Sequence, residues 1–241
     1  MIYVVLAASA IVAGIIQNIA GFGAGIMMML VLPRFFGMVT APGLNQAISV
    51  GVTIMLAWRY RAYMKPRLVL LPIIFYLIAS IGLIWIVPDL DLNLLGIFFG
   101  FLLIFLSLYF MFIQKKIHLH PTPVTAAVCG LIGGSLSGLF ALGAPAMALY
   151  FLACTDNRED YMGNLQFLLA VTNVISLSAR VARGIFTPDL LLPCAVGFAA
   201  ILTGRRIGDH IAGKMNPQAI NYFIYFLVAV SGLETLVKHL F

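Results

Sequence analysis

Apolar residues recur along the whole chain in runs that are long enough to cross a membrane, and short polar connections separate these runs. A transmembrane helix needs about 20 predominantly apolar residues. No connection is long enough to form a separate water-soluble domain. The pattern predicts an all-α, polytopic membrane bundle with eight apolar segments, at about 2–33, 44–58, 68–87, 92–113, 124–153, 164–179, 190–203 and 220–237.

The first apolar run does not have the features of a cleaved signal peptide. It lacks a basic region before the apolar stretch and an A-x-A-like cleavage site, and further spans follow it. We therefore expect this run to be retained as part of the bundle.

The eight segments fall into two groups of four whose marker residues repeat at a fixed interval. Gly143 follows Gly23 by 120 residues, and Gln166 follows Gln46 by the same interval. Many secondary transporters are built from such internal repeats. The pattern predicts two pseudo-symmetric repeats, residues 1–120 and 121–241, within one integrated transmembrane domain.

The first segment of each half is too long for one simple span, and small residues interrupt its middle. The sequence over 21–25 is Gly-Phe-Gly-Ala-Gly, and that over 141–145 is Ala-Leu-Gly-Ala-Pro. Glycine permits non-helical backbone, and proline is favoured at the start of a helix. We expect each half to open with a helix, a short unwound stretch and a half-helix that begins near Gly25 or Pro145.

The distribution of basic residues bears on the topology. If the chain doubles back at both breaks, the second half is inverted relative to the first, and ten of the 14 Lys and Arg residues share one side of the membrane. If it runs straight through, the division is nine to five. The positive-inside rule favours the inverted arrangement.

The breaks and the polar residues of the following segments predict a substrate site. Unwound backbone survives inside a membrane only where it is buried in protein or lines a wet cavity. Half-helix N-termini and side-chain N–H groups suit an anion. The candidate substrate-binding residues are Gly21, Gly23, Gly25, Asn45, Gln46, Gly143, Ala144, Pro145, Gln166, Asn173 and Arg180.

Structural roles compete with this interpretation. Glycines spaced as G-x-x-x-G, such as 130–134 and 134–138, also serve close helix packing, and polar side chains also hold helices together. We favour packing for Ser49, Thr53 and Ser176. Arg180 ends its segment, so we expect it to reach for the membrane interface. Glu234 is a candidate proton-coupling group, although its place near the C-terminus favours an interfacial role.

Composition strengthens the membrane assignment and removes other classes of protein. Hydrophobic residues make up 63% of the chain and charged residues 9%, whereas about a quarter of a soluble domain is charged. The net charge of +6 comes from short basic clusters between apolar runs, which does not indicate nucleic-acid binding. No H-E-x-x-H, G-x-S-x-G or Walker motif is present, and the three cysteines are far apart, so we predict no enzyme activity and no metal or other cofactor.

Several motifs together resemble the TauE/SafE sulfite exporter family over nearly the full length. They are the sequence Gly-Phe-Gly-Ala-Gly at 21–25, Trp-Arg-Tyr-Arg at 58–61, Gly-Leu-Phe-Ala-Leu-Gly-Ala-Pro at 138–145, and Gly-Arg-Arg-Ile-Gly at 204–208. The chain departs from the family's more glycine-rich pattern at Ala24, Ala141 and Pro145.

The resemblance implies a secondary transporter that moves sulfite, thiosulfate or an organosulfonate across a bacterial inner membrane, coupled to protons. Alternating access would come from rocking of one repeat against the other. A passive anion channel and a non-transporting membrane scaffold or assembly factor remain alternatives. The sequence predicts no oligomeric state.

Overall fold

A computed structural model describes residues 2–109, 111, 122–211 and 217–240 of the chain. These residues form α-helices and short 3-10 turns, with no strand among them. The 3-10 turns are η1 (Arg61–Tyr63), η2 (Val87–Asp89) and η4 (Pro188–Leu190). The α-helices are α1 (Ile2–Ala20), α2 (Ala24–Met29), α3 (Pro33–Arg59), α4 (Pro66–Ile86), α5 (Leu92–Leu108), α6 (Pro123–Phe140), α7 (Ala144–Cys154), α8 (Arg158–Ala182), α9 (Leu191–Ile211) and α10 (Pro217–Leu240).

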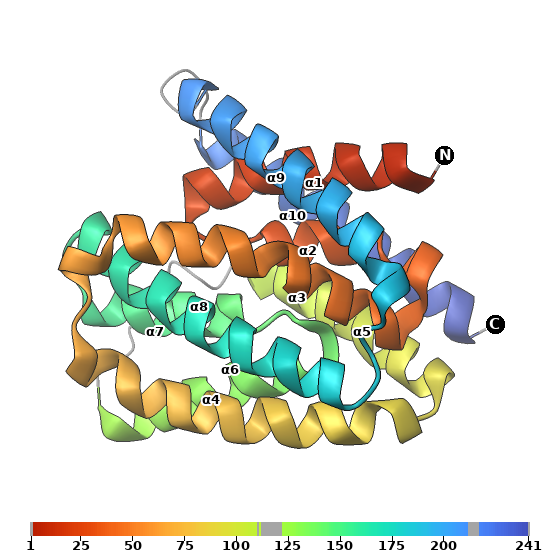
Figure 1. The fold of residues 1–241 in the computed structure, drawn as a ribbon, viewed down its shortest axis with the longest axis horizontal. Coiled ribbons are helices and arrows are strands. Elements are labelled where there is room, and N and C mark those ends of the chain that lie inside the picture. Colours follow the sequence, from red (N-terminus) through yellow and green to blue (C-terminus); the bar gives the residue numbers. More distant parts are fainter. Residues whose placement is uncertain (1, 110, 112–121, 212–216, 241) are drawn as a thin grey trace.

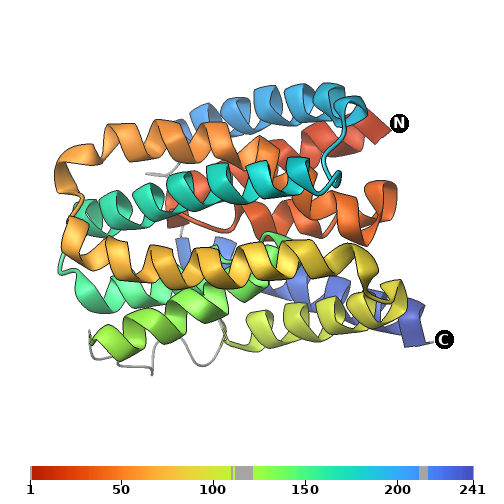
Figure 2. The same ribbon diagram turned by 60° about the horizontal axis from the view of Figure 1, so that its bottom comes forward.

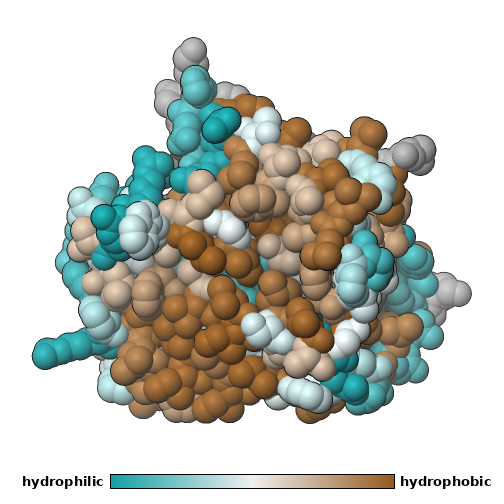
Figure 3. All heavy atoms as spheres, in the orientation of Figure 1, coloured by the Kyte–Doolittle hydropathy of each residue, from teal (hydrophilic) through white to brown (hydrophobic). Residues whose placement is uncertain are grey.

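The helices form a polytopic membrane bundle. In the described part of the chain, five are long and apolar enough to cross a membrane: α3, α4 with η2, α6, α8, and α9 with η4. Figure 3 shows a broad apolar surface across the middle of the molecule, with hydrophilic residues gathered towards the two ends of the helices. Large apolar side chains such as Leu70, Phe101, Phe105 and Val124 are exposed on the outside of the bundle. Lipid would cover them in the membrane.

Both predicted helix breaks are present. The backbone of Gly21 and Gly23 has φ of 80° and 103°, conformations that side chains other than glycine rarely adopt. After the break the chain turns back, and α2 runs beside α1 in the opposite direction (Figure 1). The half-helices begin at Ala24 and Ala144, one residue before the positions expected from the sequence.

The helices after the breaks are longer than the apolar segments that predicted them. Helix α3 has 27 residues and begins at Pro33, not near residue 44, with a kink at Gly37 (φ 74°) and Pro42 inside it. Helix α8 has 25 residues and begins with a polar turn that Asn157 caps by accepting from the amide of Asp160. A search for apolar runs does not detect these helical turns. The first turns of α3 contain arginine, glycine and proline, and the first turn of α8 contains charged residues.

The most extensive contacts join helices from different halves of the chain: α1 with α9, α4 with α6, α3 with α8, and α5 with α10. Glycines make two of these seams tight. A Cβ atom on Gly134 of α6 would lie 2.2 Å from the carbonyl oxygen of Tyr76 on α4, and one on Gly14 of α1 would lie 2.2 Å from that of Ile201 on α9. The packing role expected for Gly134 is therefore confirmed.

The first helix begins and the last helix ends at the same end of the bundle, on the right in Figures 1 and 2. The connection between α3 and α4, which carries Arg61 and Lys65, lies at the opposite end (Figure 1). The helices thus separate the described termini from this basic connection by the full thickness of the bundle.

Candidate functional site

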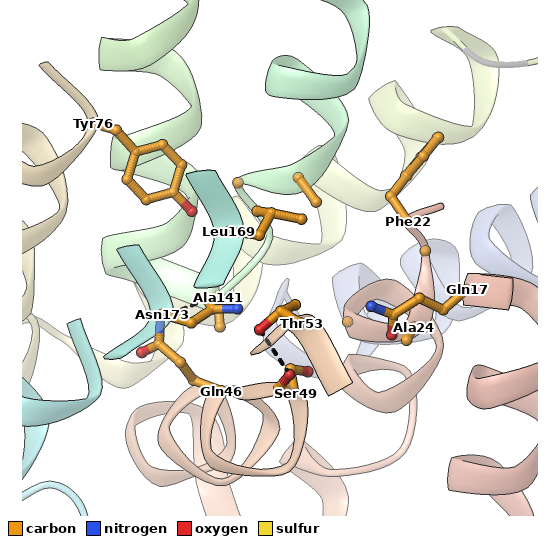
Figure 4. Close-up of a pocket in the computed structure, with 14 residues that line it drawn as sticks. Gln17, Phe22, Ala24, Gln46, Ser49, Thr53, Tyr76, Ala141, Leu169 and Asn173 are labelled. Atoms are coloured by element: carbon orange, nitrogen blue, oxygen red, sulfur yellow. Dashed lines mark hydrogen bonds between the residues drawn. The ribbon is translucent and has the colours of Figure 1, made fainter. Parts of the chain in front are cut away.

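A small cavity of about 40 Å³ lies between the two helix breaks. A buried water needs roughly 10–15 Å³ by the same kind of measure, so the cavity could hold a few waters or one small ion. Figure 4 shows its walls, to which helices from both halves contribute. The lining residues are Gln17, Phe22, Gly23, Ala24, Gly25, Gln46, Ser49, Thr53, Tyr76, Ala141, Gly143, Ala144, Leu169 and Asn173.

Six of the eleven predicted site residues line this cavity, and both breaks are represented among them. They are Gly23, Gly25, Gln46, Gly143, Ala144 and Asn173. Gly21, Asn45, Pro145, Gln166 and Arg180 do not line it. Two long helices, α3 and α8, therefore bring Gln46 and Asn173 to a space framed by the unwound backbone, 127 residues apart in the chain.

A directed chain of hydrogen bonds runs from Arg180 to the cavity wall. The Nε of Arg180 donates to Oε1 of Gln46 (2.9 Å), and Nε2 of Gln46 donates to Oδ1 of Asn173 (3.2 Å). A guanidinium has donors only, so Gln46 must turn its oxygen towards Arg180 and its nitrogen towards Asn173. Asn173 must then accept through its oxygen, which leaves its NH₂ group as a donor for the cavity.

Arg180 does not reach the membrane interface as expected; its side chain is fully buried. Its Nη2 donates to the carbonyl oxygens of Ser137 and Gly138, both at 2.8 Å, at the C-terminal end of α6. These oxygens attract a cation because they end a helix. The carbonyls and Gln46 hold the guanidinium inside the bundle, whereas sequence position alone favoured the surface.

The positive charge of Arg180 has no acidic partner in the described part of the chain. The ion pairs there join Arg34 to Glu234, Lys65 to Asp160, and Arg183 to Asp89. The Nη1 atom of Arg180 is buried without a hydrogen-bond acceptor. An unpaired buried charge is costly, and this charge makes the surroundings of the cavity electrostatically positive.

Asn45 and Gln166 support the first break instead of lining the cavity. The Nδ2 of Asn45 donates to the carbonyl oxygen of Gly25 (3.2 Å), and Nε2 of Gln166 donates to that of Gly21 (2.5 Å). The carbonyl of Gly21 belongs to the unwound stretch and needs such a donor inside a membrane, whereas that of Gly25 lies in the first turn of α2. Asn45 and Gln166 thus make the interhelical hydrogen bonds that the sequence analysis gave as the alternative to substrate binding.

The sequence analysis missed four polar residues of the cavity wall: Gln17, Ser49, Thr53 and Tyr76. Gln17 precedes the first break by one helical turn, which was a usable signal. Ser49 and Thr53 share a face with Asn45 and were assigned to packing; Thr53 does donate to the carbonyl of Ser49 (3.0 Å), but both also face the cavity (Figure 4). Nothing in the apolar run around Tyr76 marked it.

The packing role expected for Ser176 is confirmed, because its hydroxyl lies 2.9 Å from that of Ser80 between α8 and α4. Glu234 is exposed and pairs with Arg34, and neither residue lines the cavity, in agreement with the interfacial interpretation. Within the described residues, no three His, Cys, Asp or Glu side chains gather where they could hold a metal ion.

Comparison with known proteins decides the family. The model of the family described as sulfite exporter TauE/SafE matches residues 6–235. The chain belongs to the TauE/SafE family. No curated protein and no solved structure matches the chain.

Membership of the TauE/SafE family makes the chain a multi-pass membrane transporter, and not an enzyme. The family description names sulfite export, so the coarse function is a permease for sulfur anions. The cavity between the helix breaks is the place in this TauE/SafE chain where uncovered backbone, amide donors and a buried cation come together.

Proposed function

We propose that the chain is a secondary transporter that carries a small sulfur oxyanion, such as sulfite, thiosulfate or an organosulfonate, across the inner membrane of a bacterium. The anion would bind in the cavity between the helix breaks. Transport would be coupled to protons and would proceed by alternating access. The single observation that carries this proposal is the donor chain from buried Arg180 through Gln46 to Asn173.

The contents of the cavity wall support an anion as the substrate. Asn173 presents amide donors, and Tyr76 offers a hydroxyl. Arg180 supplies a positive charge one side chain behind the wall. No carboxylate lies among the lining residues.

We also propose that residues 1–120 and 121–241 are inverted repeats. Each half has the same order of elements: a helix, a break, a half-helix and three further helices. The contacts support this, because exchanging the halves turns the pair α1 and α9 into α6 and α4, and leaves the pairs of α3 with α8 and α5 with α10 unchanged. The reversal of the chain between α1 and α2 is the step that an odd number of crossings requires (Figure 1).

Alternating access would then involve two groups of helices, each drawn from both halves. One group consists of α1, α2, α3 and α9, and the other of α6, α7, α8 and α4. The tight glycine seams lie within the groups, whereas Gln46 and Asn173 meet between them. Rocking of these groups keeps the seams closed, but rocking of whole repeats would open them.

Binding of an anion is tested by thermal unfolding of the purified protein in detergent with sulfite, thiosulfate, sulfoacetate, taurine and chloride. A ligand that binds only the folded state raises the midpoint by mass action. We expect a sulfur anion to raise it selectively, and Gln46→Ala and Asn173→Ala to abolish the shift. A scaffold without a substrate would show no shift with any anion.

Coupled transport is separated from a passive channel by flux into proteoliposomes. We expect an imposed proton gradient to drive accumulation of the sulfur anion against its own gradient. A passive channel would only equilibrate the anion, at a rate set by its own gradient and the membrane potential.

A further inference from the structure

The charge balance around the cavity bears on the ionic form of the substrate. Arg180 is fully buried, and no carboxylate of the described residues pairs with it. Gln46 touches both the guanidinium and the cavity. The wall therefore carries one formal positive charge close behind it and no formal negative charge.

The helix ends at the breaks add little to this charge. The start of α2 and of α7 each contributes a partial positive charge, but α1 ends at Ala20 and α6 ends at Phe140, next to the same breaks. A helix C-terminus carries a partial negative charge of similar size. Each break thus combines opposite partial charges, and the formal charge of Arg180 dominates.

A ligand that balances this site carries one negative charge. A neutral solute would leave Arg180 buried and uncompensated, and a dianion would leave one negative charge uncompensated in a medium of low dielectric constant. Sulfate and thiosulfate are dianions at neutral pH. A sulfonate without a second ionised group, such as methanesulfonate, is a monoanion, and sulfite becomes one when it binds a proton to form hydrogensulfite.

An acceptor in the wall favours the protonated form of sulfite. Gln17 lines the cavity, and its Oε1 atom is buried without a hydrogen-bond donor among the described atoms. Hydrogensulfite can donate a hydrogen bond to this oxygen, whereas a fully deprotonated oxyanion has no proton to donate and would require the amide to turn its Nε2 group towards it. Leaving a buried acceptor unpaired carries a free-energy cost.

Among the described residues that line the cavity there is no acidic or histidine side chain that could carry a proton with the substrate. Of the lining residues only Tyr76, on α4, is titratable; the lining residues of α1, α2, α3, α7 and α8 are not, and Arg180 behind them stays charged. Glu234 and Arg34 pair with each other away from the wall. The substrate itself is the remaining place for the proton.

We propose that the cavity selects monovalent sulfur oxyanions, hydrogensulfite and sulfonates, over dianions, so that the coupled proton crosses the membrane bound to the substrate. This inference rests on the proposed function and narrows it. Sulfite would take up a proton from water on the loading side and return it to water after release. Thiosulfate and sulfate would be excluded.

The test measures equilibrium binding of three anions to the wild-type protein in detergent, at mildly acidic and mildly alkaline pH. Methanesulfonate is a monoanion at both pH values, sulfate is a dianion at both, and sulfite changes from one form to the other. We expect methanesulfonate to bind equally at both pH values and sulfate not to bind. The Kd for total sulfite should rise about tenfold per pH unit where the dianion predominates.

Two variants connect the result to the buried charge. Arg180→Gln should abolish binding of methanesulfonate and sulfite. Arg183→Gln removes the same charge from a partly exposed arginine on the next turn, paired with Asp89, and should leave binding unchanged.

The outcomes separate this inference from the proposed function. Preferential binding of sulfate, or a sulfite affinity that rises with pH, would overturn the selection of monoanions. If the affinity for methanesulfonate fell with rising pH in parallel with that for sulfite, the pH dependence would come from a group on the protein. That result would overturn the proposal that the substrate carries the proton. Failure of all three anions to bind would instead remove the anion site itself.

Discussion

Gln46 connects the buried cation to the cavity, and its amide can serve both only in one orientation. It accepts from Arg180 and donates to Asn173. A glutamate at this position could still accept from Arg180, as an ion pair, but its carboxylate could not donate to Asn173. Replacing Gln46 by glutamate therefore keeps the contact that supports the fold and removes the donor that would serve an anion.

We expect Gln46→Glu to fold with little change in thermal stability and to bind sulfur anions at least about tenfold more weakly, because a donor is lost and the charge of Arg180 is neutralised. Isothermal titration with the anion found for the wild type measures the effect. Asn93→Asp, which adds the same negative charge at the exposed start of α5, is the control and should bind normally. Undiminished binding by Gln46→Glu would show that the donor chain does not serve the substrate.

Ala141 holds the only left-handed backbone among the described residues that are not glycine, with φ of 56°. This conformation costs an L-residue about 1–2 kcal/mol. Glycine would avoid that cost, but it also makes the unfolded chain more flexible, which offsets part of the stabilisation.

We expect Ala141→Gly to raise the stability of the protein by up to about 1 kcal/mol, measured by thermal unfolding in detergent. Ala170→Gly, within helix α8, is the matched control and should lower the stability by about 0.5–1 kcal/mol. If both substitutions lowered the stability equally, the contacts of the Ala141 methyl group would stabilise the protein by more than the left-handed backbone destabilises it.

At the scale of helices, the seam between α4 and α6 depends on the absence of side chains. A Cβ atom on Gly134 would collide with the backbone of Tyr76, and backbone cannot move aside without separating the two helices. Gly82, on α4, has no atom within 4 Å of the same built position.

We expect Gly134→Ala to destabilise the protein by about 1–3 kcal/mol. Gly82→Ala should be neutral or stabilise it by up to about 1 kcal/mol, because alanine is the better helix former. Chemical unfolding in mixed micelles compares the two variants. A neutral Gly134→Ala would place the close approach of α4 and α6 in question.

Helix breaks and close-packing glycines could be predicted from the sequence because local signals mark them: glycines at short spacing, and a proline at the start of a half-helix. The first turns of α3 could not, because Arg34, Gly37 and Pro42 look locally like a loop, and contacts with the rest of the bundle override that preference. Arg180 was placed wrongly for a related reason. Its acceptors come from α6 and α3, and their carbonyl and amide oxygens carry no spacing signal.

At the scale of the whole molecule, the reversal at the first break decides which connections share a side. If the chain turns back between α1 and α2, Arg61 before α4 and Lys238 near the end of α10 face opposite sides of the membrane. If it ran straight through, they would face the same side.

We expect single cysteines introduced as Lys238→Cys and Arg61→Cys, in a background without native cysteines, to react differently in intact cells. A membrane-impermeant thiol reagent should label Lys238→Cys and not Arg61→Cys, because the basic connections face the cytoplasm. Labelling of both positions after the cells are opened is the control. Equal labelling in intact cells would contradict the reversal.

The pairing of α1 with α9 has a consequence for biosynthesis. Helix α1 leaves the ribosome well before α9, but the surface that receives its glycine face belongs to α9, which ends at Ile211. Until α9 has been made, the nascent chain therefore holds an uncovered, small-residue face in the lipid, where other membrane proteins and insertion factors can meet it. Chains that terminate before α9 would never close this seam, and the open face would expose them to recognition by membrane quality control.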